Sequence, residues 1–305
     1  MAEIIRVPRS EMAGGGKVPA IILGDNGFLR RYGSTLTITE ISRRIRYALD
    51  WADIGISAGD ERVLEAARRA RAPWVLHHTD VAFQADGRKA HFGRSMATLH
   101  ELLKARAPEF PQTDQLMGEF VASFARNTPY RSRTVFAVDS PATKRVRDRI
   151  HKYQPAMTTI GGDYLDALIA LGAIDEARAA LQPILAECRS SASIPVLTTY
   201  LAGLAESRDL LRIADGFAAV MAPLNEIGVA MPPDRDVVID SLRRLGLPVV
   251  AMHVLAGGSI KPTPALQYAL HRDRAAAVVV GASTPEHISL LMTASRQVFE
   301  GVEAR

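Results

Sequence analysis

Short apolar segments and longer segments of helical period alternate along nearly the whole chain, and this alternation restricts the fold more than any other feature. The apolar segments are rich in valine and isoleucine, as at residues 19–28, 73–80 and 275–283. The segments between them, such as "DERVLEAARRA", place apolar residues three or four positions apart. This alternation predicts β/α units arranged around a parallel sheet.

The number and spacing of these units favour a closed barrel. Nine candidate strands can be counted, at 19–28, 51–57, 73–80, 133–140, 156–162, 194–203, 216–225, 248–258 and 275–283. A (β/α)8 barrel needs eight, so one is either misread or belongs to an insertion. The spacing is longest over residues 84–133, where we expect a helical insertion or lid. We therefore predict an α/β fold, a single TIM-barrel domain over residues 1–305.

A doubly wound open sheet is the structural alternative. It is disfavoured because no G-x-G-x-x-G motif follows the first strand and no second domain boundary is visible. The cluster "AGGGKV" also fails as a phosphate-binding loop, since Val18 follows Lys17 where Ser or Thr should hold magnesium. We interpret it as a flexible turn.

Composition limits the partners and the compartment. The net charge of +4 comes mostly from arginines interspersed with acids, which is typical of solvated helices, and the basic segments lack the interleaved aromatic residues of nucleic-acid platforms. No apolar run reaches the roughly 18 residues of a membrane span, and the N-terminus lacks the apolar core of a signal peptide. We expect a cytoplasmic protein with a small-molecule substrate, no nucleic-acid or membrane partner, and the option of a homo-oligomer.

Polar residues at the ends of the apolar segments are the candidate site, because the C-terminal ends of barrel strands converge on one mouth. His253 lies near the end of an otherwise apolar segment, and imidazole suits proton transfer near neutral pH. We expect His253 and His78 to move protons and Asp53 and Asp80 to orient them. The alternatives are a core histidine bonded to a backbone carbonyl, and aspartates that cap helices or form loop salt bridges.

Other polar residues are expected at the same mouth. Alternation along a strand sends His78 and Asp80 to one face and His77 to the other. The remaining mouth candidates are Asp25, for which a tight turn is the alternative, Tyr200 and Asn225. His77, His78, Asp80 and His253 are suitable ligands for zinc, iron or manganese, but neither HxH nor HExxH spacing is present, so no metal site is predicted.

Two glycine turns near the C-terminus could bind an anion. "AGGS" and "GAST" offer backbone N–H groups beside a helix N-terminus, where a phosphate or carboxylate could approach. The alternative is that the small residues only close tight turns. The candidate anion-binding residues are Gly257, Gly258, Ser259, Gly281, Ser283 and Thr284.

Three stretches resemble the C-terminal half of an aldo-keto reductase, most closely a bacterial branch of that family. They are "DGFAAVMAPLNEIG", "LGLPVVAMHVLAGGSIKPTPALQYAL" and "AAAVVVGASTPEHISLLM". The resemblance implies a (β/α)8 barrel and a tetrad of Asp, Tyr, Lys and His. The stretch "DIGISAGDE" matches the Asp and Tyr motif with Asp53, but Ala58 stands where the tyrosine is expected. His77 or His78 replaces the lysine, and "GASTPEH" lacks the Lys and Arg that hold the 2′-phosphate of NADPH.

The absent tyrosine and lysine lead to three alternative functions. The first is cofactor-free acid–base chemistry, as an isomerase, lyase or cyclase acting on a polar anionic carbonyl compound. The second is an NADPH- or NADH-dependent oxidoreductase with a divergent proton donor, His78 or Tyr200. The third is a non-catalytic binding barrel. Among the possible cofactors, none is favoured; NADPH or NADH ranks second, and a divalent metal third.

Overall fold

A closed parallel barrel forms the centre of the molecule. The computed structural model describes residues 5, 7–30, 33–80, 83–85, 88–89, 136–138, 140–162, 165–166, 168, 173–200, 202–203, 207–231 and 234–303. The barrel order is β10-β11-β12-β13-β3-β4-β5-β9, with every neighbouring pair parallel. The strands are β3 (Ile21–Gly24), β4 (Gly55–Ala58), β5 (Val75–Asp80), β9 (Met157–Gly161), β10 (Ile194–Thr198), β11 (Ala219–Pro223), β12 (Val249–Met252) and β13 (Ala277–Gly281). The predicted (β/α)8 barrel is confirmed, and an open doubly wound sheet is excluded.

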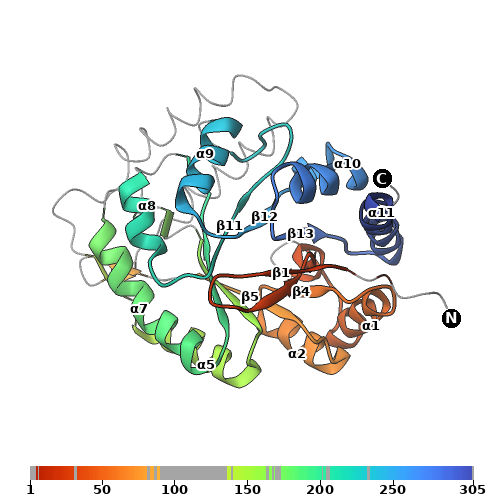
Figure 1. The fold of residues 1–305 in the computed structure, drawn as a ribbon. Coiled ribbons are helices and arrows are strands. Elements are labelled where there is room, and N and C mark those ends of the chain that lie inside the picture. Colours follow the sequence, from red (N-terminus) through yellow and green to blue (C-terminus); the bar gives the residue numbers. More distant parts are fainter. Residues whose placement is uncertain are drawn as a thin grey trace.

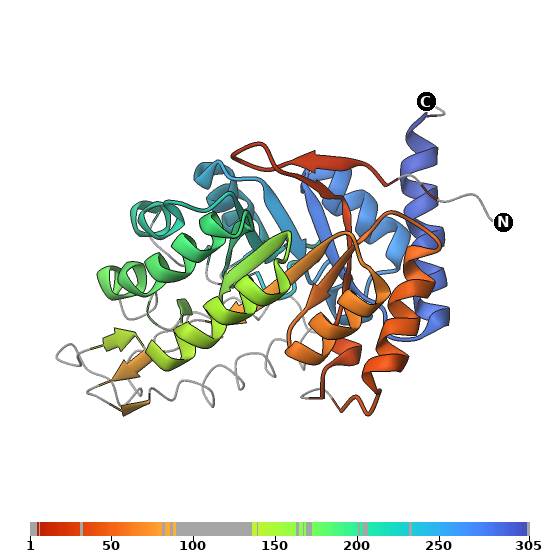
Figure 2. The same cartoon turned by 90° about the horizontal axis from the view of Figure 1, so that it is seen from below.

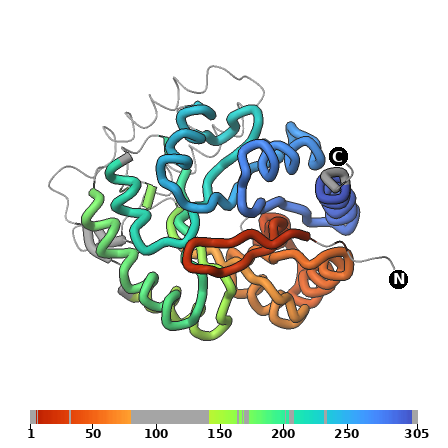
Figure 3. Tube along the Cα trace, in the orientation of Figure 1, coloured from red at the N-terminus to blue at the C-terminus, as the bar shows by residue number. Residues whose placement is uncertain are grey.

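Helices surround this barrel (Figure 1). They are α1 (Ile38–Leu49), α2 (Glu61–Ala70), α5 (Ser140–Tyr153), α7 (Ile174–Ser190), α8 (Ser207–Ala214), α9 (Arg235–Leu245), α10 (Pro262–Gln267) and α11 (Pro285–Glu303), with short turns η1 (Asn26–Phe28), η3 (Ala256–Gly258) and the π-helical η4 (Tyr268–Arg272). The last helix, α11, lies beside the first, α1, which completes the ring (Figure 3). Among the described residues, no helix is long and apolar enough to cross a membrane.

Local sequence signals explain where these helices begin. Thr37 and Glu40 form a capping box at the start of α1, in which each side chain bonds the other's backbone N–H. Asp60 caps α2 by accepting a hydrogen bond from Val63 N at 3.0 Å. Because Asp60 closely follows the end of β4, its cap fixes that loop at the C-terminal end of the barrel.

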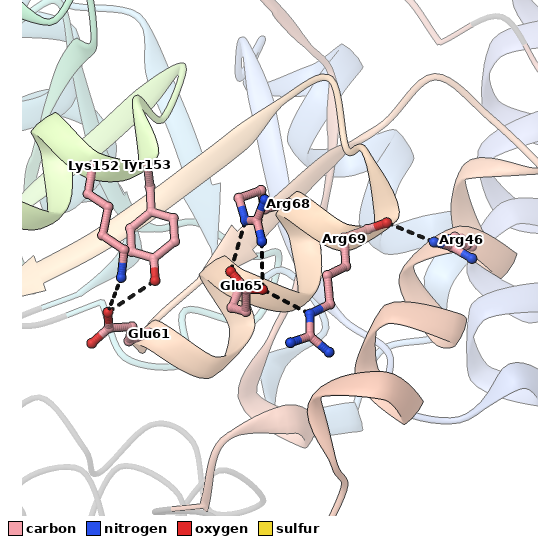
Figure 4. Close-up of polar contacts among 7 residues, drawn as sticks. All are labelled: Arg46, Glu61, Glu65, Arg68, Arg69, Lys152 and Tyr153. Carbon is pink, nitrogen blue, oxygen red and sulfur yellow. Dashed lines mark hydrogen bonds and ion pairs between the residues drawn. The ribbon is translucent and has the colours of Figure 1, made fainter.

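Polar side chains join α2 to its neighbours on the outer surface (Figure 4). Glu61 accepts hydrogen bonds from Lys152 at 2.8 Å and Tyr153 at 3.0 Å, both on α5. Glu65 binds Arg68 and Arg69 within α2. Exposed pairs of this kind contribute little individually, so the packing of apolar helix faces on the barrel carries the stability.

The N-terminal end of the barrel is closed by the antiparallel hairpin β1 (Arg9–Glu11) and β2 (Lys17–Pro19). Met12 and Val18 are 3% and 0% exposed and pack with the inward side chains Ile22 and Leu76. Figure 2 shows the hairpin at one end of the barrel. The predicted turn at "AGGG" is thus the hairpin connection, and the open mouth lies at the opposite end, where the strands terminate.

The extra candidate strand, at residues 133–140, lies outside the barrel. Its central part is β8 (Phe136–Val138), which pairs antiparallel with β6 (Phe83–Ala85), and β6 pairs with β7 (Arg88–Lys89). The extra strand therefore belongs to an added three-stranded sheet that follows β5. Most of the predicted lid at 84–133 lies outside the described residues, and its role stays a prediction.

Candidate active site at the barrel mouth

Side chains alternate along the barrel strands, so that every second one faces the barrel interior, here called the inner wall, and the others face the helices. Ile22, Leu76, Met157, Val196 and Val250 form the inner cluster together with the hairpin. Residues two positions further along these strands also face inward, so Ser57, His78, Thr159 and Thr198 lie on the inner wall near the C-terminal ends. The corresponding positions on β11 and β12 are the apolar Met221 and Met252. The mouth thus has a polar side and an apolar side.

A chain of hydrogen bonds runs along the polar side. Ser57 Oγ donates to Asp25 Oδ1 at 2.8 Å and lies 2.7 Å from His78 Nε2. His78 Nδ1 lies 2.9 Å from Thr159 Oγ1. The second oxygen of Asp25 accepts a hydrogen bond from Gly59 N. Asp25, Ser57 and Thr159 are 3%, 0% and 2% exposed, so this chain is shielded from water.

The two adjacent histidines face opposite ways. His77 points to the helices, where its Nδ1 donates to Ala58 O at 3.0 Å, and its buried Nε2 has no hydrogen-bond partner within the part of the chain that the structure describes. Burial lowers the pKa of His77 to about 4, and its bond to Ala58 O opposes this only in part. His77 is therefore a neutral core histidine, and His78 is the one that faces the mouth.

A second polar pair stands where β10 and β12 end. Tyr200 Oη lies 3.1 Å from His253 Nε2, and the two rings meet edge to face with centroids 5.6 Å apart. Buried Asp166 holds the start of this loop by accepting from Tyr200 N at 3.0 Å and from Thr199 Oγ1 at 2.6 Å. His253 has φ +55°, a left-handed conformation that costs free energy in a non-glycine residue.

One hydroxyl on the inner wall has no hydrogen-bond partner among the described residues. It belongs to Thr198, which is 8% exposed and whose Oγ1 is buried. An unpaired buried hydroxyl costs free energy, so natural structures keep one where a ligand or ordered water completes it. Thr198 is the last residue of β10, two positions before Tyr200.

The glycine loops after β12 and β13 divide into open and occupied positions. A Cβ built on Gly257, Gly258 or Gly281 would meet nothing within 4 Å, so the backbone there is accessible to a ligand. By contrast, the carbonyl of Ser283 accepts a hydrogen bond from Arg44. Thr284 Oγ1 accepts from His287 N at 3.2 Å and thereby caps α11. Ser259, the remaining candidate, is exposed in the first loop.

Two predicted site residues lie elsewhere or serve the fold. Asp53 precedes β4, because the strand begins at Gly55 and not at Trp51 as expected; it pairs with Arg9 of the hairpin at 2.6 Å, at the opposite end of the barrel. The expectation that Asp53 faces the mouth is wrong. Asn225 is buried and bonds both backbone groups of Val229, which closes a loop and leaves its amide engaged. Asp80 ends β5 opposite Gly161, and its side chain lies outside the described set.

Two residues of the site, Thr159 and Asp166, escaped sequence reasoning because they carry no motif. Ser57 and Thr198 were among the polar residues expected at strand ends, but they were given no role. The available signal was alternation: a hydroxyl two positions after an inward apolar residue near a strand's end points into the mouth. Among the described residues, no three His, Cys, Asp or Glu side chains come together as a metal site would need.

The fold matches solved aldo-keto reductases, whereas the sequence alone matches little. No protein-family model and no curated protein matches the sequence. A protein from Pseudomonas aeruginosa described as an aldo-keto reductase superposes with a TM-score of 0.58 and 16% identity, covering 98% of each chain. An aldo-keto reductase from Bacillus halodurans in its holo form gives 0.55 and 13%, covering 97% of this chain and 96% of its own. The resemblance found in the C-terminal motifs is confirmed as a likeness of fold.

Proposed function

We propose that this chain is a nicotinamide-dependent oxidoreductase that reduces a small carbonyl compound, with Tyr200 as the proton donor. The observation that carries the proposal is the hydrogen bond between Tyr200 Oη and His253 Nε2 at the barrel mouth. The reductase fold of the structural neighbours supports oxidoreduction over the cofactor-free reaction that the missing Tyr and Lys had favoured. The tyrosine missing at Ala58 is then replaced by one from the loop that follows β10.

The roles of the pair follow from their hydrogen-bonding capacities. In the tautomer in which His253 donates its Nε2 proton to Tyr200 Oη, the Tyr200 oxygen acts as the acceptor, and the phenol can donate its own proton to the substrate's carbonyl oxygen. The Tyr200 proton would then meet the negative charge that develops on this oxygen; the chemistry that a reduced nicotinamide would supply, when bound, is hydride donation to the carbonyl carbon. Asp166 fixes the Tyr200 backbone, and the unpaired Thr198 hydroxyl can bond a second polar group of the substrate.

The open glycine backbones fit the anionic part of such a cofactor. Gly257 and Gly258 lie in the loop after β12, Gly281 ends the adjacent strand β13, and a Cβ at any of the three would meet open space. A diphosphate can approach backbone N–H groups closely only where side chains are absent. The Gly258 N–H already donates to Leu255 O at 2.8 Å, so the N–H groups of Gly257 and Gly281 would hold the cofactor beside Tyr200 and His253.

The test is calorimetric titration of the purified protein with NADH and with NADPH. For the nicotinamide that binds, its oxidation is then measured in the presence of small carbonyl compounds. Tryptophan emission is a poor probe, because Trp51 and Trp74 precede β4 and β5 at the hairpin end of the barrel. We expect micromolar binding, and a loss of turnover of about 100-fold or more in Tyr200→Phe with the affinity for the nicotinamide unchanged.

Tyr47→Phe is the matched control, because Tyr47 also bonds a side chain, Ser289 at 2.7 Å, but between α1 and α11. It should retain full activity. If neither nicotinamide binds, the oxidoreductase proposal fails, and cofactor-free acid–base chemistry or a binding role becomes the better account. If both tyrosine variants keep full activity, the reaction stands but Tyr200 is not its proton donor.

A further inference from the structure

The hydrogen-bond chain on β4, β5 and β9 has a direction that fixes the state of His78. A carboxylate only accepts hydrogen bonds, so the single proton of Ser57 goes to Asp25 Oδ1. Ser57 Oγ can then only accept from His78, and Nε2 must carry a proton. The neutral form of His78 is therefore the Nε2–H tautomer, with a lone pair on Nδ1.

Thr159 is placed to satisfy either protonation state of this ring. In the neutral state, its hydroxyl can donate to His78 Nδ1 at 2.9 Å. When Nδ1 is protonated, it donates to Thr159 Oγ1 instead, and the Thr159 proton has an alternative acceptor, His77 O, at 3.4 Å. A rotation of one hydroxyl thus exchanges the two states without leaving a buried donor unpaired. A histidine with a purely structural role needs a partner set for only one state.

We infer that His78 is a second titrating group of the barrel mouth and that Asp25, acting through Ser57, is the positioning residue that sets its charge. The described residues bring Asp25 to the chain from β3, while β4 and β9 contribute the neutral Ser57 and Thr159. On the opposite face of β5, His77 remains neutral near pH 7. The Asp25 carboxylate therefore favours the imidazolium form of His78.

This inference deepens the proposed reduction and rests on it for the role in catalysis. A positive His78 adds charge at the end of the barrel where Tyr200 and His253 stand and where the carbonyl oxygen becomes negative. The Asp25 carboxylate, directly after β3, then acts through Ser57 to stabilise a positive charge on His78 of β5.

The experiment is an NMR titration of side-chain histidine nitrogens in the full chain, which needs no turnover. His78→Gln assigns the resonances. In the wild type, we expect a neutral Nε2–H tautomer at high pH and a cation at low pH. Asp25→Asn and Ser57→Ala should each lower the pKa of His78 by about half a unit or more, since each removes the carboxylate's support. Thr159→Val should lower it as well, because Nδ1–H loses its acceptor.

Asp60→Asn is the matched control. It removes a carboxylate just after Gly59 but keeps the cap of α2, because asparagine caps as well as aspartate, and Asp60 bonds Val63 and not the chain to His78. It should leave the His78 titration unchanged. His77, whose pKa burial lowers to about 4, is the internal reference in Ser57→Ala, Thr159→Val and Asp60→Asn, but not in Asp25→Asn or His78→Gln, because the charges of Asp25 and His78 also act on it. A two-dimensional amide spectrum establishes whether each variant is folded. If Asp25→Asn does not fold, the His78 titration in Ser57→Ala tests the inference.

Activity measurements separate this inference from the function it rests on. We expect Ser57→Ala to shift the pH profile of kcat in the same direction as the His78 pKa and to leave KM for the nicotinamide unchanged. The restoring variant is Ser57→Thr, which returns the hydroxyl and should return the profile. An unchanged His78 titration in both Asp25→Asn and Ser57→Ala would overturn the inference even if the protein is a reductase. A shifted titration in a protein that binds no nicotinamide would overturn the proposed reaction but not the coupling.

Discussion

At the scale of single residues, His77 links burial to the pH dependence of folding. Its folded pKa, lowered to about 4 by burial, lies below its unfolded value near 6.5. The unfolded chain therefore binds a proton more readily, so the His77 contribution is complete above pH 6.5 and is lost as the pH falls towards 4. The full shift corresponds to about 3 kcal/mol.

The check is urea unfolding of the wild type and of His77→Gln between pH 7 and pH 4.5. The glutamine keeps a donor for Ala58 O but does not titrate. We expect the wild type to lose more free energy of unfolding over this interval than the variant does, by about 1 kcal/mol or more. Equal losses in the two proteins would show that His77 does not drive acid destabilisation.

The same scale shows what the sequence can reveal about a site. Alternation alone separates inward His78 from outward His77, because it needs only the knowledge that residues 75–80 form a strand. Asp53 was misplaced since the start of its strand, Gly55, could not be located to within four residues. The chain through Asp25, Ser57 and Thr159 depends on which strands are neighbours in space, and β5 pairs with β9 across more than 70 intervening residues. No local pattern encodes that pairing.

At the scale of elements, the first turn of α11 bears on cofactor choice. Hydrogen bonds from the Glu286 backbone N–H and from Thr284, with smaller effects of the His287 and Arg44 charges, hold the pKa of Glu286 below its usual value. An ionised carboxylate thus occupies the helix N-terminus that would otherwise attract a phosphate. Since "GASTPEH" also lacks the Lys and Arg expected for a 2′-phosphate, NADH should bind more tightly than NADPH, by about tenfold.

Glu286→Lys tests this preference by calorimetry with both nicotinamides. We expect the affinity for NADPH to rise towards that for NADH, because repulsion of the phosphate becomes attraction. Glu300→Lys makes the same change of charge on the same helix but near its far end, and should leave the ratio of the two affinities unaltered. A wild type that prefers NADPH would place the 2′-phosphate away from α11.

Elements of the sheet show the same division between local and distant information. The apolar segments identified the strands correctly as strands, yet nothing within 133–140 shows that its strand pairs with β6 and lies outside the barrel. The only sign of the extra strand in the sequence was that nine candidate strands were counted, whereas a (β/α)8 barrel has eight. The number of strands that the fold requires, and not the local strand propensity, indicated that one of them belongs to an insertion.

At the scale of the whole molecule, the barrel depends on its N-terminal hairpin as a plug, which the sequence reading treated only as a flexible turn. Met12 and Val18 are buried in the inner cluster, whereas the ion pair of Arg9 with Asp53 is about two-fifths exposed on both sides. Removing a buried methionine side chain leaves a cavity beneath the inner wall, and cutting an exposed ion pair leaves solvated charges.

Met12→Ala should therefore lower the free energy of unfolding by about 2 kcal/mol or more, and Arg9→Ala by less than about 1 kcal/mol, in urea titrations at pH 7. The cavity would lie at the opposite end from His78 and Tyr200, so catalytic parameters at low temperature should remain those of the wild type. If Met12→Ala is as stable as Arg9→Ala, the packing of the hairpin against the barrel interior contributes little to the free energy of unfolding. If Met12→Ala instead changes the His78 titration, the inner core transmits packing changes along the full length of the barrel, and the plug and the mouth are one cooperative unit.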